Sequence, residues 1–280
     1  MLVVMTVTLT AVLAALSLLF LGLESWRPAI RGQKHLRRGW RTDVIYWFIV
    51  STIGKWFARA IVLLGIALLG ILATQSLDRD AIKAWAMRDT PLQRQPWALQ
   101  AFEILVLTDF VGYWSHRMFH AWPPAWRFHA IHHSSTEVDW LSAVRLHPIN
   151  DAVSNVLTAA AFVLVGFDAK TLAFAVPFFT LYAIALHANL DWSVGPLRYV
   201  VASPVYHRWH HTTEEEGLDK NFAGLFPAYD LIFGTAYLPK GQQPRKFGIS
   251  GEPVPDSFWG QLIYPFRPAA RATLAPPPSE

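Results

Sequence analysis

The sequence contains no cysteine among its 280 residues. Disulfides, thiolate-ligated haem, iron–sulfur clusters and zinc ribbons all require cysteine, so each of them is excluded. Charged residues are also scarce, at 16%, whereas a soluble domain usually contains about a quarter. Because hydrophobic residues make up 53% of the chain, this shortage of charge predicts a membrane protein.

Long apolar segments support that prediction. Residues 1–23 carry no charge and exceed the ~20 apolar residues that cross a bilayer. Further apolar segments occupy residues 60–77, 98–115, 152–167 and 170–187. Residues 44–54 either extend the second of these helices or lie at the membrane interface. The pattern predicts an all-α integral membrane protein with about four to five transmembrane helices.

The basic residues indicate an orientation. Eight lysines and arginines lie between Arg27 and Arg59, whereas the loop 78–96 contains four, offset by three aspartates. Cytoplasmic loops carry the excess of positive charge in membrane proteins. We therefore expect the first loop in the cytoplasm, where its arginines contact anionic membrane lipids. A nucleic-acid partner is not expected.

Ten of the eleven histidines lie between His116 and His211. They include one H-x-x-x-H pair and two H-x-x-H-H triplets, and at 3.6 residues per turn each set occupies one helical face. We therefore expect the histidines of one triplet to point the same way. Two more, His147 and His187, stand alone. The predicted topology brings all ten to the cytoplasmic side of the membrane.

Clustered imidazoles point to bound metal, because imidazole binds iron, zinc, copper and nickel. Ten exceed the needs of one ion, so we predict two ions with open positions. Iron is favoured because an apolar site with open positions suits O2, although ligand type alone equally allows zinc. The predicted metal ligands are His116, His120, His129, His132, His133, His147, His187, His207, His210 and His211.

Three polar residues are candidates for a supporting catalytic role. Asp109 lies seven residues before His116 on the same helical face, and a carboxylate inside a membrane is costly unless it serves a function. We expect it to accept a hydrogen bond from a ligand imidazole and to fix its tautomer. Asn189 and Asp191 follow His187 closely, and we expect them to orient it.

The combined motifs resemble the fatty acid hydroxylase / sterol desaturase superfamily. The resemblance runs from about Leu107 to Thr235 and includes DFVGYWSHRMFH, WRFHAIHHSS, RLHPI, SPVYHRWHHT and DKNFAGLFPAYDLIFGT. It implies a membrane bundle beneath a cytoplasmic helical cap that carries two iron ions bound by the three histidine motifs, with His147 and His187 in matching contexts. It further implies O2, an external electron-transfer protein, and hydroxylation or desaturation of an aliphatic C–H bond in a lipid.

The chain divides into three parts on this basis. Residues 1–97 are expected to form membrane anchor helices, residues 98–240 a fatty acid hydroxylase-like catalytic core, and residues 241–280 a partly disordered extension. Two alternatives stay open. One is another histidine-box enzyme, such as an acyl desaturase or alkane hydroxylase. The other is a non-enzymatic membrane metal carrier, which predicts histidines spaced along a path through the membrane.

Overall fold

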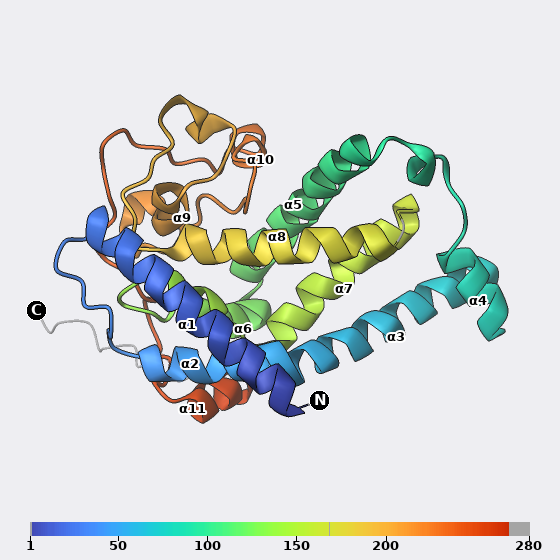
Figure 1. The fold of residues 1–280 in the computed structure, drawn as a ribbon, viewed down its shortest axis with the longest axis horizontal. Coiled ribbons are helices and arrows are strands. Elements are labelled where there is room, and N and C mark those ends of the chain that lie inside the picture. Colours follow the sequence, from blue (N-terminus) through green and yellow to red (C-terminus); the bar gives the residue numbers. More distant parts are fainter. Residues whose placement is uncertain (1, 168, 269–280) are drawn as a thin grey trace, which may run out of the picture.

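The computed structural model describes residues 2–167 and 169–268 (Figure 1). These residues form helices and loops, with two isolated bridges and no β-strand, which confirms the all-α prediction. Three helical stretches are long and apolar enough to cross a membrane: Val3–Trp26, Trp40–Thr74 and Pro148–Val165. The disorder predicted for the tail, residues 275–280, lies outside the described residues.

The N-terminal region consists of two long helical stretches. Helix α1 (Leu2–Trp26) is followed by a basic loop and then by α2 (Trp40–Ile49), a π-helical turn (Val50–Gly54) and α3 (Lys55–Thr74). Because α2, the π turn and α3 are continuous, residues 44–54 extend the second membrane-length helix. Phe20 of α1 stacks on Trp140 with ring centroids 5.4 Å apart, which fixes α1 against the rest of the molecule.

A second bundle follows, made of α5 (Trp97–Ala121), α7 (Pro148–Val165) and α8 (Ala169–His187). Both α7 and α8 pack against α5, and α3 lies along α7 (Figure 1). Of α8, Ala175–His187 is a shorter apolar helix. The ends of α5 and α8 meet under the cap, so His116 and His187 lie in two neighbouring histidine groups.

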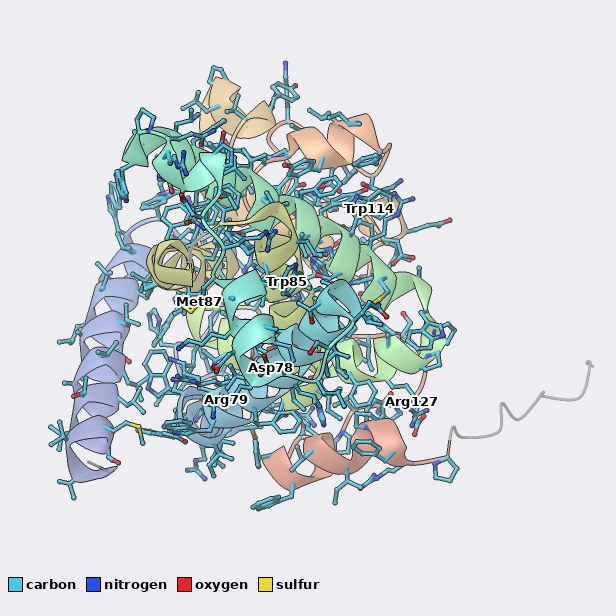
Figure 2. All side chains as sticks on the ribbon, turned by 90° about the vertical axis from the view of Figure 1, so that its right-hand side faces the viewer. Asp78, Arg79, Trp85, Met87, Trp114 and Arg127 are labelled. Carbon is cyan, nitrogen blue, oxygen red and sulfur yellow. The ribbon has the colours of Figure 1, made fainter. Side chains whose placement is uncertain are left out.

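The polar loop between α3 and α5 closes the other end of the bundle. It contains α4 (Arg79–Ala86) and a 3-10 turn (Pro91–Arg94), and Figure 2 views the molecule from this end, with Trp85 and Met87 labelled. The side chains of Thr90 and Gln93 donate to the Gly166 carbonyl at the α7–α8 turn. Gly166 has φ of 97°, a conformation that glycine adopts without strain.

Short helices and loops form a cap over the ends of α5 and α8. After α5, Pro123 begins α6 (Pro123–His133), where its fixed φ suits the first turn of a helix. Ser203 caps α9 (Pro204–His210) by accepting from the Tyr206 N–H. The remaining elements are 3-10 turns at Trp140–Val144, Gly195–Tyr199, Glu215–Gly217 and Tyr264–Phe266, with α10 (Ala228–Ile232) and α11 (Phe258–Ile263).

Candidate metal centre

Nine of the ten predicted ligands gather into two neighbouring groups at the junction of α5, α6, α8 and the cap. Within each group the potential ligand atoms all lie within 4.8 Å of one another. We call them group one and group two. Group one consists of His116, His120, His129, His133 and His210, and group two of His132, His187, His207 and His211.

Each H-x-x-H-H motif contributes to both groups. On α6, His129 and His133 belong to group one, while His132 belongs to group two. The motif that begins on α9 reverses this division, because only its His210 belongs to group one. The expectation that one triplet points a single way is therefore wrong: adjacent residues diverge by about 100° around a helix, enough to serve two ions.

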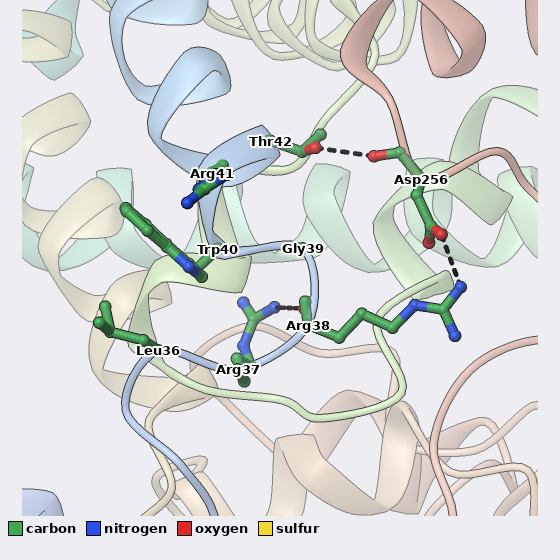
Figure 3. A pocket seen from close by; sticks show the side chains of 8 residues that line it. All are labelled: Leu36, Arg37, Arg38, Gly39, Trp40, Arg41, Thr42 and Asp256. Atoms are coloured by element: carbon green, nitrogen blue, oxygen red, sulfur yellow. Dashed lines mark hydrogen bonds and ion pairs between the residues drawn. The ribbon is translucent and has the colours of Figure 1, made fainter.

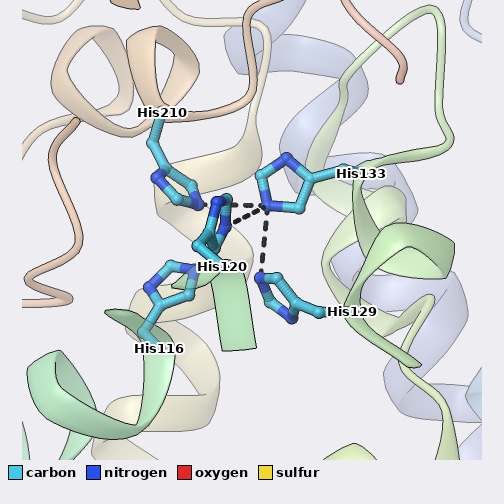
Figure 4. A group of neighbouring side chains, drawn as sticks. All are labelled: His116, His120, His129, His133 and His210. Atoms are coloured by element: carbon cyan, nitrogen blue, oxygen red, sulfur yellow. Dashed lines mark hydrogen bonds between the residues drawn. The ribbon is translucent and has the colours of Figure 1, made fainter. Parts of the chain in front are cut away.

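The ring nitrogens of group one converge on one point (Figure 4). The Nε2 atom of His133 lies 3.2 Å from the Nε2 atoms of His120 and His129, and 3.1 Å from that of His210. His116 belongs to the same group, and its Nε2 is buried with no hydrogen-bond partner among the described residues.

The outward-facing nitrogens of group one determine which tautomer is present. His116 Nδ1 lies 2.9 Å from the Phe222 carbonyl oxygen, and His129 Nδ1 lies 2.9 Å from Asn150 Oδ1. Because these acceptors carry no proton, each Nδ1 must donate, and each Nε2 is left with a lone pair. His120 Nδ1 and His210 Nδ1 also face oxygen acceptors, so the three Nε2 atoms that lie 3.1–3.2 Å from His133 Nε2 all carry lone pairs that can bind a cation.

Group two forms a chain of Nε2 contacts. They join His132 to His187 at 3.1 Å, His187 to His207 at 3.2 Å, and His207 to His211 at 3.1 Å. His132 Nδ1 donates to the Arg145 carbonyl at 3.3 Å, and His187 Nδ1 to the Ala183 carbonyl at 2.7 Å. The same tautomer argument applies to these two rings, so group two also presents lone pairs to a common space.

Burial keeps these imidazoles neutral. Removal from water lowers the pKa of His129, His132 and His133 in α6 well below the usual value, and neighbouring imidazoles lower it further. Burial has the same effect on the pKa of His207, His210 and His211 in and after α9. Neutral imidazole is the form that binds metal, so the residues fit a pair of ions.

The structure does not bring His147, the tenth predicted ligand, to either group. Its Nδ1 accepts from the Ile149 N–H at 3.1 Å, and its Nε2 donates to the Leu262 carbonyl at 3.1 Å. With both ring nitrogens occupied, His147 serves as the N-cap of α7. A histidine that directly precedes a proline at the start of a helix can act as an N-cap. The motif spacing alone does not distinguish such a cap from a metal ligand.

Asp109 binds the cap instead of a ligand imidazole. Its carboxylate accepts from three consecutive backbone N–H groups, those of Gly224 at 2.9 Å, Leu225 at 2.8 Å and Phe226 at 2.7 Å. The expected hydrogen bond from a histidine is absent from the described part of the chain. Asp109 acts on the site indirectly, because the segment it holds begins beside Phe222, the partner of His116.

Asn189 and Asp191 also differ from expectation. Asn189 Oδ1 accepts from the Ile30 N–H at 2.8 Å and its Nδ2 donates to the Ile30 carbonyl, while Asp191 accepts from Gln243 Nε2. Neither hydrogen bonds to His187 within residues 2–167 and 169–268. They attach the loop after α1 and the C-terminal segment to the end of α8.

Two residues that sequence reasoning did not assign to the ligands contact them directly. Asp219 Oδ1 accepts from His120 Nδ1 at 2.9 Å, and Asn150 Oδ1 accepts from His129 Nδ1. Asn150 directly follows RLHPI, so this flank of the family pattern lies next to a residue that holds His129, whereas its own histidine, His147, caps α7. Asp219 opens DKNF, a flank of the family pattern.

A buried ionic cluster supports group two from the N-terminal region. Asp43 accepts from Arg37 at 2.6 Å and from Arg145 Nε at 2.6 Å, and Arg37 also donates to Asp139 at 2.7 Å. All four side chains are buried. Because the Arg145 carbonyl accepts from His132, this cluster fixes one ligand of group two. No local motif linked residues 37–43 to the site.

Comparison with known proteins agrees with this geometry. The fatty acid hydroxylase family model matches residues 101–235, which contain all nine grouped histidines. The ornithine lipid hydroxylase OlsE of Rhizobium tropici is 28% identical over 179 residues, covering 64% of this chain and 54% of that protein. Human alkylglycerol monooxygenase is 30% identical over 140 residues, covering 50% of this chain and 31% of that protein.

A rice very-long-chain aldehyde decarbonylase, GL1-1 (Oryza sativa subsp. indica), is 29% identical over 184 residues, covering 61% of this chain and 29% of that protein. The chain thus spans about half the length of the first of these relatives and about a third of the others. No solved structure matches the chain. The matched segment, the histidine groups and the apolar helices together show a membrane protein that carries a fatty acid hydroxylase domain over residues 101–235.

Proposed function

We propose that this protein is a membrane-bound di-iron oxygenase that hydroxylates or desaturates an aliphatic C–H bond of a lipid. The observation that carries the proposal is the convergence of nine imidazoles into two adjacent groups, in which six rings donate outward through Nδ1 and turn a lone pair inward. A structural zinc site closes four ligand positions around one ion, and it does not need a second group.

The two groups would each hold one ion, group one through five histidines and group two through four. Iron bound there supplies the capacity to activate O2. Hydroxylation consumes one C–H bond, one O2, two electrons and two protons, and yields one alcohol and one water. The C–H bond supplies two of the four electrons that reduce O2. The other two must come from a donor, so the reaction requires an external electron-transfer protein.

The chain itself supplies neutral ligands in fixed tautomers and a dry surrounding. Aromatic rings lie against group one: Trp126 and Phe222 have ring centroids 4.9 Å and 5.1 Å from that of His120, and Phe119 stacks on His129 at 5.6 Å. These rings exclude water, which strengthens electrostatic interactions inside the site and limits side reactions.

A lipid is the substrate class that this architecture favours. Leucines such as Leu18, Leu64 and Leu72 project from the membrane helices with more than half of their surface exposed, so bilayer hydrocarbon surrounds the bundle. The relatives named above as an ornithine lipid hydroxylase and an alkylglycerol monooxygenase act on lipids, which supports the same class here.

The basic loop before α2 favours a cytoplasmic site beside anionic headgroups. An open pocket of about 340 Å³ at the start of a membrane helix is lined by Trp40, by Arg41, and by Arg38 with its ion-pair partner Asp256 (Figure 3). Arginine and tryptophan at this depth suit a lipid phosphate. By the positive-inside tendency, the loop and the histidine groups would lie on the cytoplasmic side.

The alternatives make different predictions. A metal carrier needs sites spaced along a path, whereas the nine histidines are gathered in one place. Acyl desaturases and alkane hydroxylases share histidine boxes, and the product separates them from a lipid hydroxylase.

Comparative lipidomics tests the proposal. Cells that express the protein should gain lipids heavier by one oxygen, or lighter by two hydrogens, relative to cells that express His133→Ala. The same products in both strains would contradict an oxygenase that uses these histidines, and transition-metal flux into vesicles without lipid oxidation would favour the carrier.

A further inference from the structure

The two groups differ in what holds their outward nitrogens. Three ligands of group one donate to a single segment, residues 219–222: His120 to Asp219 Oδ1 at 2.9 Å, His210 to the Lys220 carbonyl at 2.8 Å, and His116 to the Phe222 carbonyl. We call this segment the strap. In group two, by contrast, His207 Nδ1 is buried with no partner among the described residues.

The strap is itself firmly held. Asn221 donates to the Tyr206 and Tyr237 carbonyls and accepts from the Tyr237 N–H at 2.7 Å. Asp230 accepts from the Phe222 N–H at 2.8 Å. These bonds keep Asp219 and Asn221 in the left-handed region, with φ of 52° and 58°, which non-glycine residues rarely adopt. The strap is therefore held by hydrogen bonds that do not involve the histidines of group one.

The surrounding charges also favour cation binding by group one over group two. Asp219 places a carboxylate on His120, whereas the positive charges of Arg37 and Arg208 act on His187 in group two. Arg37 is compensated by Asp43 and Asp139. The Arg208 guanidinium is fully buried, and its Nε and Nη2 lack hydrogen-bond partners within the described residues, so its charge is offset only through space, by Glu24 and Asp139.

We infer that the two ion sites are unequal: group one binds its ion first and retains it longer, and Asp219 is the positioning residue that sets this order. The inference rests on the proposed metal binding. A carboxylate that accepts from a ligand imidazole fixes its orientation and raises its basicity, and losing such a partner typically weakens metal binding about 10–100-fold. We expect the lower end, about 10-fold, because Asp219 is 75% exposed and water screens its charge.

The test measures metal retention in the purified full-length protein. After loading with ferrous iron without oxygen, or with Co²⁺, the protein is dialysed against increasing chelator, and metal per chain is measured by elemental analysis. We expect two separate steps of loss. His207→Ala should keep the ion that leaves last, and His116→Ala should lose it, which assigns that ion to group one.

Asp219→Asn should move the last step to about 10-fold lower chelator, and Asp219→Glu should restore part of the difference. Asp89→Asn is the matched control, because Asp89 is also an exposed carboxylate with one charged partner, Arg94, in the 78–96 loop. Two ions lost in one step, or an unchanged last step in Asp219→Asn, would overturn the inference and leave the proposed function standing. A protein that binds no metal would overturn both.

Discussion

Group one and group two use the same ligand but obtain their support from different parts of the chain. The outward partners of group one, including the strap and Asn150, lie within residues 101–235, the segment that matches the family model. Group two depends in addition on Arg37 and Asp43, which precede that segment. The difference teaches that the matched domain contains every ligand of the centre but not every residue that positions them.

Removing a central ligand from either group should have the largest effect. His133 contacts three other Nε2 atoms of group one, and His207 contacts two of group two. Because the proposed O2 chemistry uses both ions, His133→Ala and His207→Ala should each reduce lipid oxidation to the level of an empty vector. Residual activity in only one of them would show that a single group suffices.

Low pH should destabilise the folded protein, because it favours protonation of the histidines in both groups. Burial lowers the pKa of the imidazoles in α6 and α9, so the unfolded chain binds protons that the folded chain excludes. Stability of the metal-free protein is therefore complete above pH ~6.5 and falls as the pH decreases below it, by about 1.4 kcal/mol per pH unit for each such imidazole.

Thermal unfolding of the metal-free protein between pH 8 and pH 5 checks this expectation. A melting temperature that stays level, or rises, towards pH 5 would mean that the imidazoles are not held neutral in the folded state.

Breaking the buried ionic cluster should affect group two selectively. Asp43→Asn leaves Arg37 and Arg145 without part of their compensating charge, and breaking a buried ion pair costs about 3–5 kcal/mol. Asp89→Asn at an exposed pair should cost about 0–1 kcal/mol. Denaturation in detergent compares the two. Equal losses of stability would contradict the role assigned to the cluster.

His147→Ala should have the smallest effect, because His147 caps α7 and does not face either group. Loss of a helix cap costs about 0.5–2 kcal/mol, so the protein should melt earlier but keep its full metal content. Loss of an ion from His147→Ala would show that His147 is a metal ligand.

The helical class and the gathering of nine histidines could both be predicted from the sequence, because each depends on local properties. Apolar length and the i, i+3, i+4 spacing of His129, His132 and His133 are local properties that a helix expresses directly. The division of that triplet between two groups depends on where α8 and α9 pack, which spacing on one helix does not specify. Proximity in the chain to a histidine predicts that Asp109, Asn189 and Asp191 bind the ligands, but closeness in sequence does not determine hydrogen-bond partners.

Long-range contacts explain the remaining differences. Asp109 is seven residues from His116, but the backbone of residues 224–226 provides three donors for its carboxylate, which a single imidazole cannot match. Asp219 reaches His120 across 99 positions of the chain. Likewise Asp43 meets Arg145 only after the N-terminal helices fold onto the cap. Such pairs leave no periodic pattern in the sequence.

Metal content per chain tests the central claim most directly. Elemental analysis of the purified protein should find two iron ions in the wild type, one in His133→Ala, one in His207→Ala, and two in His147→Ala, because each group would hold one ion. A wild-type protein with a single ion that is lost in both His133→Ala and His207→Ala would contradict a two-ion centre.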